Sequence, residues 1–182
     1  MSMSARFFRN GLMALAGLAL AGLFPMDFAW SQTAGLGCVL EPAGGSSRRV
    51  LRCRDGLTIT LEDGAGFALT DRDGNGVADA VRLRRKAILL DAPGELSAPG
   101  FQVVTPQAIA AVRGTQWAVD VATGKTSVFV VRGRVAVQRP SAGAGVLLGP
   151  GEGVDVEAGT APLTVKRWPQ ARVSALLARL GQ

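Results

Sequence analysis

The stretch that decides the fold is residues 101–137, FQVVTPQAIAAVRGTQWAVDVATGKTSVFVVRGRVAV. Its segments WAVDV (117–121) and VAV (135–137) place apolar side chains at every second position. This alternation is typical of strands that bury one face and leave the other face in water. The stretch therefore predicts a series of short strands, interrupted by the compact motif Val112-Arg113-Gly114-Thr115.

The same pattern continues on both sides of this stretch. Asp63-Gly64 favours a tight turn, so we expect residues 56–62 and 67–70 to form a hairpin. Arg132-Gly133 is expected to join the last two strands of the central stretch. The sequence predicts an all-β fold, either an antiparallel β-sandwich or a solenoid-like domain of many short strands. The other expected strands are 80–90, 101–105, 109–112, 116–121, 126–131, 135–138, 146–148 and 154–156.

The C-terminal segment changes to a helical period. Val173, Leu176, Leu177 and Leu180 stand at i, i+3, i+4 and i+7, which predicts an amphipathic helix between Pro169 and a stop at Gly181. We expect its apolar stripe to pack on the sheet, with Trp168 as an anchor. The expected organisation is a signal peptide, an N-terminal loop segment, a β-domain, and a linker with the helix, over residues 1–31, 32–54, 55–158 and 159–182.

The N-terminus has the pattern of an export signal. Two arginines precede an apolar run over residues 12–24, and small residues flank a cleavage site near Ser31. This predicts a periplasmic or secreted mature chain that does not span the membrane, because no second apolar run approaches the roughly 20 residues of a spanning helix. Two alternatives are an uncleaved N-terminal anchor and lipidation at Cys38, although Gly35 stands where a lipoprotein signal prefers a Leu-like residue.

Cys38 and Cys53 are the two cysteines of the chain. In an exported protein they most simply form a disulfide with each other, pinning the Pro-, Gly- and Ser-rich residues 41–49 as a loop. The loop-entropy relation gives about 3 kcal/mol of stabilisation for a closure of this length. A redox or metal role is less favoured, because the spacing is not Cys-x-x-Cys and the chain contains no His.

Residues 71–79, DRDGNGVAD, resemble calcium loops of the EF-hand and dockerin type. Asp71, Asp73, Asn75 and Asp79 occupy positions one, three, five and nine, where hard oxygen ligands are required, and a glycine occupies the sixth position. The twelfth position, which an EF-hand gives to a bidentate carboxylate, is Arg82. The other interpretation is a metal-free turn built from Asp-Gly and Asn-Gly pairs.

Composition argues against several classes of function. The net charge is +6, but the cations are spread along a chain without Tyr, so nucleic acid is not an expected partner. The basic run 82–86 could contact acidic glycans or lipid headgroups, although the wet face of a sheet explains it more simply. Without His, a nucleophile elbow or a complete phosphate loop, we expect no catalytic residues and no enzyme activity.

The central motif, together with Thr105-Pro106, Arg132-Gly133 and residues 148–154, resembles the FecR domain over about residues 55–156. This resemblance implies a β-rich fold and a location in the cell envelope. The family includes periplasmic regulators of iron uptake, which link an outer-membrane receptor to a cytoplasmic anti-sigma region. It also includes exported proteins that carry the domain without that machinery.

The motif itself is explained mainly by structure. Gly114 favours a bulge or a close backbone approach, and Arg113 can bridge carbonyl groups or bind an anion with its planar guanidinium. We therefore expect an exported, non-enzymatic module that binds a protein or a cell-envelope polymer. Two alternatives remain: a signalling component of an iron-related sigma/anti-sigma pathway with a separate membrane partner, and a calcium-dependent glycan-associated module.

Overall fold

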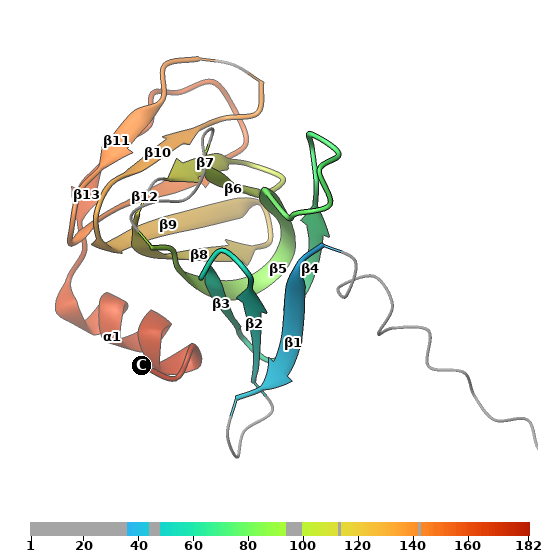
Figure 1. Ribbon diagram of the computed structural model, residues 1–182. Coiled ribbons are helices and arrows are strands. Elements are labelled where there is room, and N and C mark those ends of the chain that lie inside the picture. Colours follow the sequence, from blue (N-terminus) through green and yellow to red (C-terminus); the bar gives the residue numbers. More distant parts are fainter. Residues whose placement is uncertain (1–35, 44–47, 94–99, 113, 142) are drawn as a thin grey trace, which may run out of the picture.

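The all-β prediction is confirmed by a computed structural model, which describes residues 36–43, 48–93, 100–112, 114–141 and 143–182 (Figure 1). Its one helix is α1, Gln170–Arg179. The predicted signal peptide lies outside the described residues. The strands are β1 Cys38–Pro42, β2 Arg49–Cys53, β3 Thr58–Leu61, β4 Gly66–Thr70, β5 Ala80–Asp91, β6 Phe101–Val104, β7 Ile109–Val112, β8 Gln116–Ala122, β9 Lys125–Arg132, β10 Val135–Gln138, β11 Val146–Leu148, β12 Glu152–Glu157 and β13 Lys166–Arg167.

The strands form one continuous sheet that folds into two layers at the long strand β5. The C-terminal half of β5 pairs with β3 and β8 in the first layer, which runs β1-β2-β3-β5-β8-β9-β12-β13. The N-terminal half pairs with β4 and β6 in the second layer, which continues through β7 and β10 to β11. The arrangement is therefore a sandwich of two layers joined through a shared strand.

β5 changes layer at an irregular point. Lys86 has φ = 68°, which makes it the one non-glycine residue with a positive φ in the described part of the chain. Just before it, Gly66 of β4 pairs with Arg85 while Phe67 pairs with Leu83, so Arg84 is an extra residue in a β-bulge. The bulge and the left-handed residue together bend the strand from one layer into the other.

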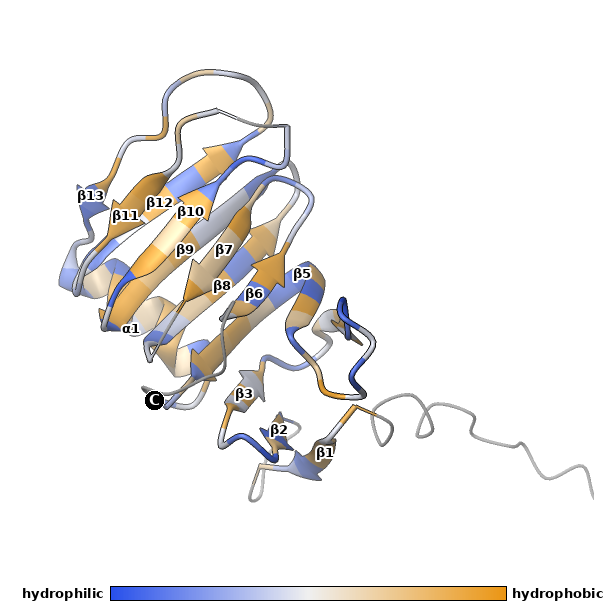
Figure 2. Cartoon of the chain, turned by 45° about the horizontal axis from the view of Figure 1, so that its top comes forward, coloured by the Kyte–Doolittle hydropathy of each residue, from blue (hydrophilic) through white to orange (hydrophobic). Residues whose placement is uncertain are grey.

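The core lies between the two layers. Inward-facing side chains of both layers are buried there, with Trp117 the largest and fully enclosed. The hydrophobic residues of successive strands line up along both layers in Figure 2. Helix α1 lies outside this sandwich and buries Val173, Leu176 and Leu180 against the outer face of the first layer, so the predicted amphipathic helix and its packing are confirmed. Trp168 anchors it by stacking on Phe129, with ring centroids 5.1 Å apart.

Two predicted hairpins are wrong. β3 and β4 do not pair with each other, because they bind different halves of the bent strand β5. Likewise β9 does not pair with β10: β9 lies between β8 and β12, whereas β10 lies between β7 and β11. In both cases a short turn signal marks a change of layer rather than a hairpin.

Two further features differ from the sequence expectations. The N-terminal segment is not only a loop: β1 and β2 form an antiparallel hairpin, and β2 continues the first layer by pairing with β3. One strand pair is parallel, β5 with β6, in an otherwise antiparallel sheet. No helix in the described part of the chain is long and apolar enough to cross a membrane.

Candidate functional site

The central motif lies at a corner where the chain leaves the second layer after β7 and enters the first layer at β8. The reverse crossing, from β9 to β10, lies beside it, because Val112 pairs with Val135 and Gln116 pairs with Arg132. A third crossing, from β11 to β12, lies at the same end, where Leu148 also pairs with Val135. The central motif, Arg132-Gly133 and residues 148–154 thus gather in three stacked corners, whereas Thr105-Pro106 lies at the other end of β7.

Contacts between the corners are close. Gly114 has φ = 60° and Gly133 has φ = 85°. A Cβ on Gly133 would lie 2.7 Å from the Thr115 hydroxyl oxygen and 2.9 Å from the Gly114 carbonyl oxygen. The fully buried Thr115 donates its hydroxyl hydrogen to the Arg134 carbonyl oxygen at 3.2 Å. Side chains are excluded at Gly133 because the two corners touch through their backbones.

The third corner is tied to the same strands. Gly151 donates its backbone N–H to the Val130 carbonyl oxygen at 2.9 Å, and the Glu152 carboxylate accepts the N–H of Gly149 at 2.7 Å. These hydrogen bonds hold the third corner against β9, so the glycines of the corners are explained by the fold. Arg113, predicted to bridge carbonyls or bind an anion, lies outside the described residues.

Thr105-Pro106 forms the turn between β6 and β7. The Thr105 hydroxyl accepts the Ala108 N–H at 2.8 Å and lies 2.9 Å from the hydroxyl of Thr126, and both threonines are buried. The turn therefore closes on itself through a side chain, as Thr side chains do in many turns. This local closure explains the threonine at the start of the turn.

The predicted disulfide is present between Cys38 and Cys53. It joins directly paired residues at the open end of the β1–β2 hairpin. The bond therefore cross-links the outermost strand pair of the first layer.

The calcium-like segment is a turn between β4 and β5. The Asp71 carboxylate accepts backbone N–H groups from Gly74, Asn75 and Gly76 at 2.7–3.2 Å, and the hydrogen bond from Gly76 is the main cause that lowers the pKa of Asp71. Asp79 forms an ion pair with Arg72. Within the described ranges no three His, Cys, Asp or Glu residues are grouped as metal ligands. Calcium binding by Asp71, Asp73, Asn75 and Asp79 stays a prediction.

Two arginines of α1, which sequence reasoning missed, bind the helix to the sheet. Arg179 contacts both oxygens of Asp120 at 2.7 and 2.9 Å and also binds Glu62. These hydrogen bonds, first from Asp120 and then from Glu62, raise the pKa of Arg179. Arg172 stacks over Trp168 and donates a hydrogen bond to Asp155. The signal in the sequence was their i, i+7 spacing beside the apolar stripe.

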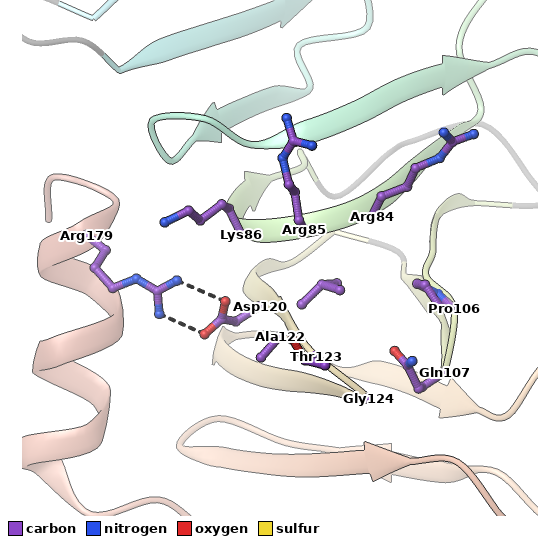
Figure 3. A pocket seen from close by; sticks show the side chains of 11 residues that line it. Arg84, Arg85, Lys86, Pro106, Gln107, Asp120, Ala122, Thr123, Gly124 and Arg179 are labelled. Atoms are coloured by element: carbon purple, nitrogen blue, oxygen red, sulfur yellow. Dashed lines mark hydrogen bonds and ion pairs between the residues drawn. The ribbon is translucent and has the colours of Figure 1, made fainter.

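A polar groove of about 590 Å³ lies beside Arg179 (Figure 3). Its walls come from the bend of β5, the turn between β6 and β7, and the turn between β8 and β9. Three consecutive cations, Arg84, Arg85 and Lys86, stand on β5, while Gln107 and Thr123 lie across from them. Together with Arg179, these three cations line the groove and make it a candidate site for an anionic ligand.

Fold and site together define the class: a two-layered all-β domain with stacked corners and a helix fixed to its outer face by arginines. The sequence matches the FecR protein family over residues 42–136, which is more than half of its 182 residues. The chain belongs to the FecR family. The match begins at the end of β1, so it includes the second strand of the disulfide-linked hairpin.

Solved structures with a similar fold come from Parabacteroides distasonis. Two crystal structures, at 2.50 and 1.65 Å resolution, are of a protein described as a putative anti-sigma factor. They align with TM-scores of 0.56 and 0.55 at 19% identity, over 77% and 76% of this chain. The aligned part is 64% of each of those chains, so this chain spans less than two thirds of their length. A search of curated proteins found no match to this sequence.

Proposed function

We propose that this FecR domain acts in cell-envelope signalling, without enzyme activity, by binding another protein. Membership of the FecR family supports the proposal, as does the fold shared with structures described as putative anti-sigma factors. The partner is a membrane-associated component of a sigma/anti-sigma pathway. This chain supplies the FecR domain to that pathway.

The open edge at β11 carries the proposal. β11 pairs with β10 on one side and with no other described strand. Its middle residue, Leu147, is 58% exposed. An unpaired strand offers backbone donors and acceptors to a partner strand, and side chains beside it supply specificity. We therefore place the protein contact at this edge.

Export is the second part of the proposal. The expected signal over residues 1–31 would release a periplasmic or secreted chain beginning near Ser31. The Cys38–Cys53 bond supports this location, because disulfides persist in oxidising compartments. Mass spectrometry of the purified protein would give the mature N-terminus and show whether Cys38 carries lipid.

Site-specific photo-crosslinking in cells tests the protein contact. A photoreactive residue at Leu147 is compared with one at Val77, an aliphatic residue 40% exposed in the turn before β5. We expect Leu147, and not Val77, to capture a membrane-associated regulator or receptor. Equal capture at both positions, or capture of no such protein, would contradict the proposal.

A cell-envelope polymer is the second candidate partner, favoured by one observation. Three consecutive cations on β5 are exposed beside a groove instead of alternating with buried residues. Recovery of peptidoglycan or polysaccharide with the purified chain, in place of a regulator, would favour this candidate. The calcium-dependent glycan-associated role would in addition require calcium to bind the side-chain oxygens of the turn at Asp71.

A further inference from the structure

The bend of β5 brings three positive charges together in a way that a regular strand cannot. Regular alternation would point Arg85 inward, because Arg84 and Lys86 would share the opposite face. The bulge at Arg84 and the positive φ of Lys86 break this alternation, so all three side chains are exposed. Bulges and left-handed non-glycine residues concentrate at functional sites.

The charge of the groove is not cancelled by its carboxylates. Four cations and one carboxylate, Asp120, line it, and both oxygens of Asp120 are bound by Arg179. The nearby carboxylate of Glu62 is also bound by Arg179, and it lies 3.8 Å from the Lys86 ammonium. Positive charge therefore remains in excess along β5.

The cations are also available to a ligand. Arg84 has no hydrogen-bond or ion-pair partner among the described residues. Arg85 uses its Nε to bind the Gly64 carbonyl oxygen at 3.1 Å, which leaves the ends of its guanidinium group for another acceptor. Lys86 is half exposed beyond its long contact with Glu62. An arriving carboxylate thus displaces few existing contacts.

The opposite wall of the groove is neutral and polar. It consists of the turn 122–124, with the Thr123 hydroxyl, and the turn at Pro106-Gln107. The Gln107 amide oxygen lies 2.9 Å from the Thr126 hydroxyl, so its NH₂ group is the part left for a ligand. Hydroxyl and amide groups match the hydroxyls of a sugar, and a volume of about 590 Å³ lies within the range of small-ligand sites, about 300–1,000 Å³.

We propose that this groove binds an acidic oligosaccharide, with Arg84, Arg85 and Lys86 on its carboxylates and Gln107 and Thr123 on its hydroxyls. Arginine forks fit carboxylates in a bidentate manner, and lysine adds a mobile point charge. The site is separate from the β11 edge, since it lies on β5 and the turns beside α1. It does not depend on the protein contact proposed there, and it rests on the second candidate function, a cell-envelope polymer bound through the same cations.

Isothermal titration of the purified chain with a uronic-acid trisaccharide tests the proposal. A neutral trisaccharide of the same length and inorganic tripolyphosphate are the comparison ligands. We expect binding of the acidic sugar that weakens with salt, as screening of exposed charges requires, and no binding of the neutral sugar. No detectable binding of the acidic sugar at low salt, or equal binding of both sugars, would overturn the proposal.

Matched variants locate the site. Arg84→Ala should weaken binding of the acidic sugar by up to about five-fold, the upper end of the scale for one exposed charge pair. Arg82→Ala is the control, because Arg82 is exposed on the same strand but does not line the groove. Thr123→Val should weaken the sugar and leave tripolyphosphate unaffected. Equal losses from Arg82→Ala and Arg84→Ala, or tighter binding of tripolyphosphate than of the sugar, would overturn the assignment.

Discussion

Substitution of Gly133 by Ala should test the stacked corners directly. The new methyl group would meet the Thr115 hydroxyl oxygen at 2.7 Å, the Gly114 carbonyl oxygen at 2.9 Å and the Thr115 Cα at 3.1 Å. Two of these atoms belong to backbone and cannot swing away. Gly133 also has φ = 85°, where a Cβ is strained even in open space.

The magnitude has two parts. A left-handed conformation costs a residue with a Cβ about 1–2 kcal/mol. Crowding in a packed region adds about 1–3 kcal/mol. The free energy of unfolding should therefore fall by about 2–5 kcal/mol, and the cooperative transition should move to clearly lower denaturant.

Gly124→Ala supplies the matched control. Gly124 has φ = 72° and no atom within 4 Å of an added Cβ, so it pays the conformational cost without the clash. Urea unfolding, followed by Trp fluorescence, gives both free energies under one condition. If the two variants lose the same stability, the corners do not press on each other as described and the reasoning is refuted.

Three further predictions concern other parts of the molecule. Cys38→Ser with Cys53→Ser should lower the free energy of unfolding by about 3 kcal/mol, measured by urea unfolding; an unchanged value would show that the hairpin needs no cross-link. Although partial burial raises the pKa of Asp155, hydrogen bonds from Arg172 and Ser127 outweigh it, so the pKa lies below its ordinary value of 3.8. A carboxyl group whose pKa is lowered by folding stabilises the fold above its unfolded pKa, and this stabilisation is lost as the pH falls through its folded pKa. The difference in free energy of unfolding between the wild type and Arg172→Ala should therefore shrink below pH 3.8. A difference that stays constant in urea unfolding between roughly pH 7 and pH 2.5 would contradict this. Because Arg82 stands where a calcium loop of this type places its bidentate carboxylate, Tm should be the same in calcium and in chelator, and a rise in calcium would establish a metal loop.

The alternation of apolar residues predicted most of the strands, and the apolar stripe predicted the helix, because both signals are local. Strand partners are not local. Arg132-Gly133 has the chemistry of a hairpin turn, yet the chain crosses between layers there. The reason is that β9 pairs with β12 and β10 pairs with β7, and both partners are distant in the sequence. The same limit applies to Asp63-Gly64, where β3 and β4 bind separate halves of β5.

The candidate groove could be predicted from the sequence only in part. Arg82 and Arg84 alternate with apolar residues as in a regular strand, and only the adjacent Arg85 and Lys86 break the rhythm. This change of pattern coincides with the bulge and the bend of β5. Gln107 and Thr123 belong to turns that are distant from β5 in the sequence, so only the pairing of the strands brings them to the groove. The partners of Arg179, Glu62 and Asp120, are similarly remote, 117 and 59 residues away.

A transcript profile of a strain that lacks this gene tests the proposed signalling role most directly. Loss of the chain should change the expression of a defined set of genes, and the intact chain should restore it. Gly133→Ala and a chain without residues 1–31 should fail to restore it, because the first disrupts the corners and the second is not exported. Unchanged transcripts in the deletion strain, or full restoration by the chain that lacks residues 1–31, would contradict the account.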